Sequence, residues 1–297
     1  LETICIGGLK NVGILKTLLT LLQLPGSLIQ SRKIVRGFAP SLVVGLGGYS
    51  SGPVVLASKW LGFPTLIIEP NVQPGFTNRL LRHWVDGAAV AYQETLAVFG
   101  SKCRVTGIPI RPAFHKINSK ISREGPLKIL VFGGSRGSRA INNLICEALP
   151  FLSSRCVSLV HQTGPSDYSK VKETYQQTNL EVEPIKFIQD MPKRFLDADL
   201  IIARSGALTL AEITASGKAS ILIPFPQATD NHQMKNAKIL SDRNASLMLI
   251  EKNTSGRELA HLIMELEKDR ERLSHMAQAA KVLAQPESVH KIIKLMQ

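Results

Sequence analysis

The sequence has 297 residues, of which 44% are hydrophobic and 5% aromatic, and a formal net charge of +13. This length suffices for two domains that each bury a core. The four cysteines form no CxxC pair and have no histidine close by, which excludes a disulfide framework and a zinc finger. A basic chain so poor in aromatic residues, without a helix-turn-helix or RNA-binding signature, is not typical of nucleic-acid-binding proteins, so no nucleic acid partner is expected.

The start of the chain is basic and apolar at once. Residues 1–120 hold 13 Lys or Arg against 4 Asp or Glu. The basic residues that flank the apolar runs 12–15 and 18–22 are Lys10, Lys16, Arg32, Lys33 and Arg36. No apolar run is long enough to cross a bilayer. This pattern is typical of a segment that lies on an anionic membrane surface, and also of a core helix with a solvated basic rim.

Strand-like runs alternate with helical patterns along the chain, which predicts an α/β protein with two doubly wound parallel-sheet domains facing a cleft. The expected strands are 42–46, 65–69, 88–92, 104–106, 128–132, 157–161, 182–188, 199–203, 220–224 and 246–250. Residues 111–126 read as a linker between a first domain, 1–110, and a second, 127–285. Helical patterns fill 257–284, and Pro286 precedes a last helix over 288–296.

Two strand-to-helix turns in the second half are suited to a diphosphate. One is Gly133–Ser138, which is no Walker A loop because no Gly-Lys-Ser/Thr follows it. The other is Ser205–Ala207, after which a helix begins with free N–H groups and the positive end of its dipole. Glu212, one turn inside that helix, is placed to accept hydrogen bonds from ribose or sugar hydroxyls. An ordinary turn with a solvated glutamate is the alternative.

Other residue patterns argue against metals and cofactors. No histidine belongs to an HExxH or similar close pair, although His161 and His232 are expected near the nucleotide. Asp197 and Asp199 resemble a metal-binding DxD pair, but they precede their strand and are expected to be structural. The Gly45–Gly48 turn lacks the third glycine of a dinucleotide fingerprint, so no cofactor is expected.

The order of the motifs closely resembles the peptidoglycan N-acetylglucosaminyltransferase (MurG) family, whose members have the GT-B fold. The matching segments are Ile6–Lys10, Val44–Pro53, Glu69–Asn71, Gly107–Arg111, Phe132–Gly137, His161–Gly164, Phe187–Met191 and Arg204–Thr209. Members open with a glycine-rich loop that ends in His, and nothing like it is present here. We therefore expect the N-terminal domain to be incomplete by roughly sixty residues, judged from typical βαβ lengths.

The resemblance implies an inverting transferase that moves N-acetylglucosamine from UDP-GlcNAc to lipid I, undecaprenyl-pyrophosphoryl-MurNAc-pentapeptide. It also implies a peripheral location on the cytoplasmic face of the cell membrane, and a final helix, 286–297, that returns to the first domain. The implied UDP-GlcNAc contacts are Asn71, Arg111, Ser135, Ile188, Ala207, Leu208, Thr209, Leu210, Ala211, Glu212 and Gln233. Without the His loop, Glu69 is the candidate base. The family usually has His-Glu-Gln-Asn where this chain has Ile68-Glu69-Pro70-Asn71. A UDP-sugar epimerase and a noncatalytic UDP-sugar-binding protein remain as alternatives.

Overall fold

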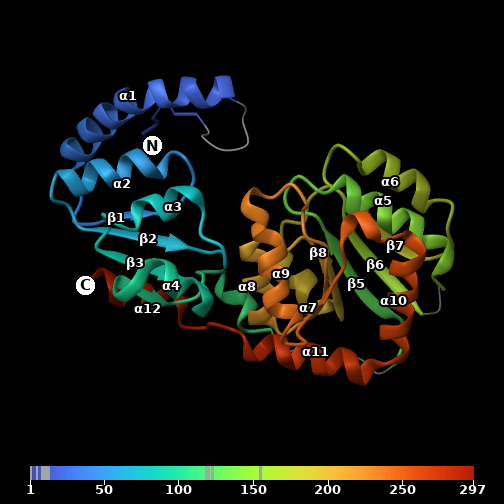
Figure 1. The fold of residues 1–297 in the computed structure, drawn as a ribbon. Coiled ribbons are helices and arrows are strands. Elements are labelled where there is room, and N and C mark those ends of the chain that lie inside the picture. Colours follow the sequence, from blue (N-terminus) through green and yellow to red (C-terminus); the bar gives the residue numbers. More distant parts are fainter. Residues whose placement is uncertain (1, 5, 8–13, 118–120, 122–123, 154–155) are drawn as a thin grey trace. The chain divides into compact units, whose positions relative to one another are not determined.

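The computed structural model describes residues 2–4, 6–7, 14–117, 121, 124–153 and 156–297 (Figure 1). Within the first helix, the side chains of residues 14–19 and 21 are outside this description. The chain forms two compact units. The first contains Leu1–Pro109, Gln227–His232 and Glu287–Gln297, and the second contains Ile110–Pro226 and Gln233–Pro286.

The first unit has a parallel sheet of four strands in the order β1-β2-β3-β4. Its strands are β1 (Val43–Gly45), β2 (Thr65–Glu69), β3 (Gly87–Val90) and β4 (Cys103–Val105). Its helices are α1 (Ile14–Phe38), α2 (Ser51–Trp60), α3 (Phe76–Leu81), α4 (Leu96–Phe99) and α12 (Ser288–Met296). In Figure 1, α1 lies along α2, and α2 covers the sheet.

Successive side chains of a strand point to opposite faces of the sheet, and both faces of this sheet are covered by helices. Ile67 of β2 packs with Val55 of α2 on one face. Its neighbours Leu66 and Ile68 point the other way and pack with Ile292 of α12. The last helix of the chain therefore completes the core of the first unit.

The second unit has a parallel sheet of six strands in the order β10-β9-β8-β5-β6-β7. The strands are β5 (Leu127–Phe132), β6 (Val157–Gln162), β7 (Glu181–Ile185), β8 (Leu200–Ala203), β9 (Ala219–Leu222) and β10 (Leu247–Met248). The helices are α5 (Arg139–Ala148), α6 (Tyr168–Tyr175), α7 (Met191–Asp197), α8 (Ala207–Ser216), α9 (His232–Ser241), α10 (Gly256–Lys268) and α11 (Arg270–Val282). Alternate residues of β5 face separate hydrophobic clusters, with Ile129 and Val131 in one and Leu130 and Phe132 in the other.

All ten predicted strands are present, each within a few residues of its expected bounds. The helical pattern over 257–284 divides into α10 and α11 at Asp269, whose carboxylate accepts a hydrogen bond from the Arg272 N–H at 2.8 Å and caps α11. The segment that reads as a linker packs on the second unit, where Phe114 is fully buried against Phe195 with ring centroids 5.0 Å apart. Among the described residues, no helix combines the length and apolar character that a membrane span requires.

Candidate nucleotide-sugar site

Three turns of the second unit meet at one edge of its sheet. Phe132 of β5 pairs with Ala203 of β8, and Ala203 pairs in turn with Leu222 of β9. Since all three strands are parallel, the turns that follow them share the carboxyl edge of the sheet. Ligands of doubly wound sheets bind at this edge. The sequence motifs therefore converge as expected.

The turn after β5 depends on glycine. A Cβ on Gly133 would lie 2.2 Å from the Ser138 Cβ, and a Cβ on Gly137 would lie 2.0 Å from the Thr163 carbonyl oxygen. The turn thus packs directly on the backbone of the turn after β6. Ser138 then caps α5 by accepting a hydrogen bond from the Ile141 N–H at 3.5 Å. Ser135, at the tip of the turn, is exposed and open to a ligand.

Gln162, at the end of β6, connects this turn to Ile188. The side chain is 1% exposed; its amide donates to the Gly134 carbonyl at 2.8 Å, and its oxygen accepts from the Ile188 N–H at 2.8 Å. Ile188 itself is buried among hydrophobic side chains, so any contact it makes with a nucleotide would come from its backbone. The sequence analysis assigned no role to Gln162, although it belongs to a quoted motif.

The helix α8 carries the predicted run from Ala207 to Glu212. Gly206 precedes it without a side-chain cap, which leaves the first N–H groups for a ligand. Leu208 is exposed, whereas the Leu210 side chain is 1% exposed and packs in the core. The predicted contact of Leu210 is therefore restricted to its backbone, because helical periodicity turns its side chain inward.

Glu212 lies on the same helix and pairs with Arg111 at 3.7 Å. The carboxylate side chain is 18% exposed, and its burial raises the pKa of Glu212 while the nearby Arg111 guanidinium opposes that shift. Arg111 in turn stacks over Phe114, with 5.0 Å between its guanidinium carbon and the ring centroid. Two predicted site residues, from separate segments, are thus in contact.

Gln233, in the first turn of α9, is held against the turns after β8 and β9. Its side-chain oxygen accepts a hydrogen bond from the Phe225 N–H at 2.9 Å, and its carbonyl accepts from the Ser205 hydroxyl at 2.8 Å. Ser205 directly precedes the Gly206 cap of α8. Gln233, the predicted sugar contact, and the start of α8 are therefore connected.

His161 lies near the carboxyl end of β6, but its side chain is buried and so is not available to a nucleotide, contrary to expectation. The ring is 0% exposed, with Nδ1 2.5 Å from the Tyr175 hydroxyl and Nε2 3.0 Å from Asn142 Oδ1. Burial lowers the pKa of His161 from 6.5 to about 3. This histidine is a structural residue of the core.

We expect this burial to make stability depend on pH. The unfolded chain binds a proton at His161 near pH 6.5, whereas the folded chain resists protonation down to about 3. The free energy of unfolding should therefore fall as pH drops below 6.5, by up to about 1.4 kcal/mol per pH unit from this group. Urea unfolding of the parent and of His161→Gln between pH 7 and 4.5 tests this, with the variant expected to show the smaller slope. Equal slopes would contradict it.

The aspartates of the DxD-like pair lie at the amino edge, as predicted. Asp199 accepts a hydrogen bond from the Lys128 N–H at 3.0 Å and lies 3.9 Å from the Arg270 guanidinium. The described residues contain no group of three His, Cys, Asp or Glu side chains arranged to hold a metal ion. Asp199 therefore stabilises the strand ends of β5 and β8.

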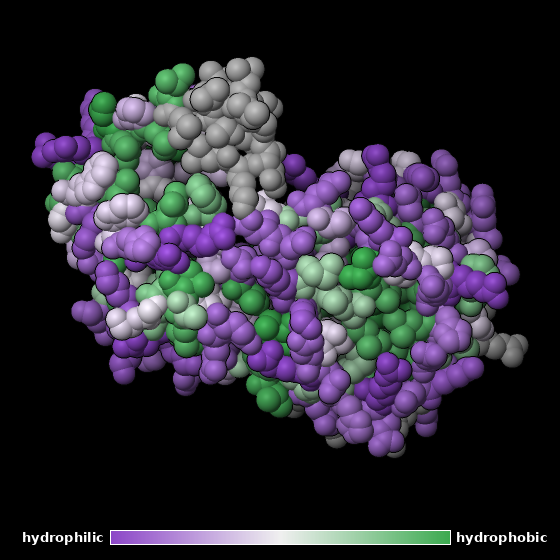
Figure 2. All heavy atoms as spheres, viewed as in Figure 1, coloured by the Kyte–Doolittle hydropathy of each residue, from purple (hydrophilic) through white to green (hydrophobic). Residues whose placement is uncertain are grey.

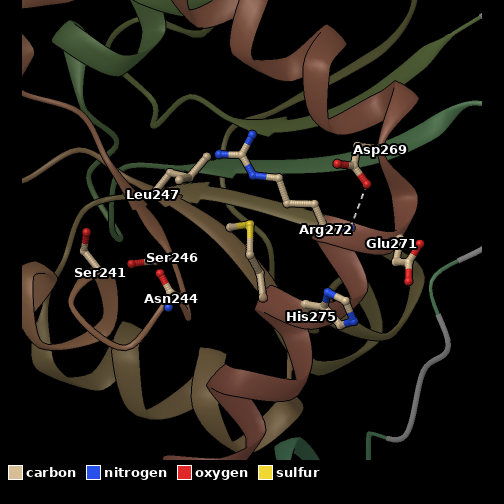
Figure 3. Close-up of a pocket in the computed structure, with 9 residues that line it drawn as sticks. Ser241, Asn244, Ser246, Leu247, Asp269, Glu271, Arg272 and His275 are labelled. Atoms are coloured by element: carbon tan, nitrogen blue, oxygen red, sulfur yellow. Dashed lines mark hydrogen bonds between the residues drawn. The ribbon is translucent and has the colours of Figure 1, made fainter.

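A separate pocket of about 540 Å³ lies beside the amino end of β10 (Figure 3). Arg272 extends from α11 toward Leu247, and Ser241, Asn244 and Ser246 lie together beyond it. These residues belong to none of the motifs, and the pocket is at the opposite edge of the sheet from the three turns. It lies apart from the candidate nucleotide-sugar site.

On the first unit, the residues predicted to lie beside the acceptor substrate, Glu69 and Asn71, belong to one hydrogen-bond network. The Glu69 carboxylate is 2% exposed and accepts four hydrogen bonds, from the N–H and side-chain amide of Asn71 at 2.9 and 3.2 Å, the Gly75 N–H at 2.9 Å and the Asn78 amide at 2.9 Å. Asn78 also lies against the glycine loop, because its amide nitrogen is 3.3 Å from where a Gly47 Cβ would be. Both carboxylate oxygens are occupied by protein donors. This geometry suits a residue that holds the loop better than a proton acceptor.

Models of known families match both units. The glycosyltransferase family 28 N-terminal domain matches residues 1–90, and the C-terminal domain of the same family matches residues 128–295. The chain belongs to glycosyltransferase family 28. The two matches together include the turns after β5, β8 and β9 and the hydrogen-bond network of Glu69.

Curated family 28 relatives share one name, UDP-N-acetylglucosamine--N-acetylmuramyl-(pentapeptide) pyrophosphoryl-undecaprenol N-acetylglucosamine transferase. The protein from Syntrophus aciditrophicus is 43% identical over 264 residues, which cover 88% of this chain and 73% of the relative. The protein from Myxococcus xanthus is 42% identical over 297 residues, which cover 98% of this chain and 77% of the relative.

Solved structures agree on the fold. The crystal structure of Acinetobacter baumannii MurG superimposes with a TM-score of 0.82 at 30% identity, over 98% of this chain and 83% of that one. The two parallel α/β units are therefore those of the GT-B fold, as predicted. A UDP-GlcNAc 2-epimerase from Neisseria meningitidis has a TM-score of 0.64 at 13% identity, over 97% of this chain and 83% of that one. The second likeness shows the fold alone.

Proposed function

We propose that this family 28 member transfers N-acetylglucosamine from UDP-GlcNAc to undecaprenyl-pyrophosphoryl-MurNAc-pentapeptide. The observation that carries the proposal is 42% identity, over 98% of the chain, to a relative named for this reaction. The glycine turn after β5 and the uncapped start of α8 supply the diphosphate site that such a donor needs. The epimerase alternative has no comparable support, since the epimerase structures share 12–13% identity with this chain.

The second unit would bind the donor, UDP-GlcNAc, through the following contacts. Backbone N–H groups of the glycine turn and of α8 would stabilise the negative charge that develops on the departing UDP. Glu212 would accept hydrogen bonds from ribose hydroxyls, Gln233 would contact the sugar, and Ile188 would meet the uracil through its backbone. Ser135, Arg111 and the run Ala207–Ala211 would complete the nucleotide contacts.

The first unit would hold the acceptor. Glycosyl transfer with inversion forms a bond between the acceptor oxygen and the anomeric carbon while the bond from that carbon to UDP breaks. The acceptor proton must pass to a base. Asn71 lies in the loop that Glu69 holds, and we place that loop beside the acceptor.

A radiolabelled transfer assay tests the proposal. With labelled UDP-GlcNAc and lipid I, label should appear in a lipid product and the anomeric configuration should invert. An epimerase would instead change the sugar of UDP-GlcNAc without any acceptor, and a noncatalytic binding protein would bind the donor without turnover. Either result would overturn the assignment.

We further propose that α1 attaches the chain to an anionic membrane surface. The large apolar side chains Leu22, Ile29 and Phe38 are 78%, 71% and 79% exposed. The α1 side chains that point inward include the small polar Thr20, Ser27 and Ser31. Val35, at 4%, is also buried on that side. A core helix with a basic rim would not leave such large apolar side chains exposed. In Figure 2, hydrophobic and strongly hydrophilic residues alternate over the part of the surface where α1 and α2 lie.

Exposed basic residues accompany these exposed apolar side chains, namely Arg32, Lys33 and Arg36. Lys10 is outside the described residues, and so is the side chain of Lys16. Reversing the charges of the first three to Glu should weaken binding to anionic phospholipid vesicles by about 1 kcal/mol per residue, and added salt should have a similar effect. Vesicle flotation measures this. The control is the same reversal at Lys172, Lys252 and Lys268, exposed on the second unit. An equal loss in both variants would contradict a specific role of α1.

A further inference from the structure

Arg204 occupies an unusual position at the nucleotide edge. It directly follows β8 and is 9% exposed. Its Nη1 donates to the carbonyl oxygens of Ile223 at 3.0 Å and Pro224 at 3.1 Å, just after β9. Its Nη2 donates to the Ser138 hydroxyl at 2.8 Å, at the end of the glycine turn after β5. One guanidinium thus joins the turns that follow three neighbouring strands.

A fourth segment contributes the counter-charge. Glu251, which follows β10, places Oε2 2.6 Å from Arg204 Nη1. The guanidinium also stacks over the Phe225 ring, 5.3 Å from its centroid. Because the Phe225 N–H is bonded to the Gln233 side chain, Arg204 is connected to Gln233 through that segment. All of these contacts lie within the second unit.

We propose that Arg204 is a positioning residue that sets the diphosphate turn and the sugar-reading segment relative to each other, with Glu251 holding its guanidinium in place. This inference rests on the proposed function. The planar fork of an arginine suits it, because a lysine cannot donate to three oxygens in this fixed geometry. Arg204 acts through Ser138 and Phe225, so it need not touch the ligand.

The direction in which UDP-GlcNAc affinity changes when Glu251 is removed tests this proposal. Glu251 is a negative charge at an edge that receives a diphosphate, so removing it should tighten UDP-GlcNAc binding if charge alone mattered. If Glu251 instead holds Arg204 through its charge, Glu251→Ala and the isosteric Glu251→Gln should both weaken UDP-GlcNAc binding. Glu265→Ala, an exposed site on α10, is the matched control for charge and should bind as the parent does.

Ser138 gives an independent variant that leaves Arg204 in place. Ser138→Ala removes the oxygen that Arg204 Nη2 reaches, and we expect UDP-GlcNAc affinity to fall roughly tenfold or more, as for a lost hydrogen bond to a charged group. Ser138→Thr keeps a hydroxyl and should retain the affinity. Uridine affinity should change less in both variants, because uridine lacks the diphosphate that the turn would hold. This selectivity separates positioning from general unfolding, which would lower every affinity.

Calorimetry with UDP-GlcNAc and with uridine measures all of these variants. If the parent fails to bind UDP-GlcNAc, the proposed function itself fails. If the parent binds, and either Glu251→Ala binds more tightly or Ser138→Ala binds equally well, only the positioning role of Arg204 is overturned.

Discussion

Glu69→Ala should unfold at markedly lower urea concentration than the parent. The substitution leaves four donors, from Asn71, Gly75 and Asn78, without their acceptor at a site that is 2% exposed. Each buried donor left unsatisfied costs about 1–3 kcal/mol, so we expect a loss of about 3 kcal/mol or more in the free energy of unfolding of the first unit. Urea unfolding followed by circular dichroism measures it.

Asp86, which directly precedes β3, provides a control because it bonds to the other end of β2. Its carboxylate accepts hydrogen bonds from the N–H and hydroxyl of Thr65 at 3.0 Å each, at the amino end of β2. The Asp86 side chain is 49% exposed, so water can replace much of what Asp86→Ala removes. We expect a smaller loss of stability and normal transfer activity. Equal losses of stability in Asp86→Ala and Glu69→Ala would show that the buried Glu69 network stabilises the unit no more than an exposed carboxylate does.

Glu69→Gln separates a base from a residue that holds the loop. A base is needed only in the chemical step, so its loss would lower kcat by about 10²–10⁴-fold and leave stability and the acceptor KM unchanged. A loop holder would show reduced stability and a raised acceptor KM, and Asn78→Ala would reproduce both effects. UDP-GlcNAc affinity should stay near the parent value, because the donor turns belong to the other unit.

The sequence predicted the strands well because each is a short apolar run between glycine, proline or polar turns. Thr65–Glu69 shows this, since all five residues are buried and the predicted bounds match the structure. The break at Asp269 was missed because good helix formers continue on both sides of it, so that periodicity alone gives no signal. Only the N-cap character of aspartate could have indicated it.

Site residues were predictable where the chemistry is local to a motif. The glycine turn after β5 and the uncapped start of α8 follow from adjacent residues. The contacts of Glu69 do not, because two of its donors are Gly75 and Asn78, at the start of α3 and within it, and the sequence does not specify where that helix lies against β2. The same holds for Arg204, whose partners Ser138, Ile223 and Glu251 are distant in sequence and meet only through the order of the strands.

Glu212→Ala should weaken UDP-GlcNAc binding by about 1.5–3 kcal/mol, the range for hydrogen bonds to a charged group. The carboxylate is mostly buried and stands one turn inside α8, where ribose hydroxyls would reach it. Calorimetry on the folded variant measures this loss. Unchanged affinity would remove Glu212 from the nucleotide site, and Glu258→Ala, an exposed capping residue of α10, is the control for loss of a carboxylate elsewhere in the unit.

Arg111 should control the pH at which this contact fails. Burial raises the pKa of Glu212, and the Arg111 guanidinium 3.7 Å away opposes the shift. An ionised Glu212 accepts hydrogen bonds strongly, so UDP-GlcNAc affinity should fall as pH drops through the Glu212 pKa. Without Arg111 that pKa rises further, and Arg111→Met should therefore lose affinity at a higher pH than the parent. If Arg111 instead contacts only the ligand, Arg111→Met will weaken binding equally at every pH, and the Glu212→Ala, Arg111→Met double variant will show the sum of the two losses.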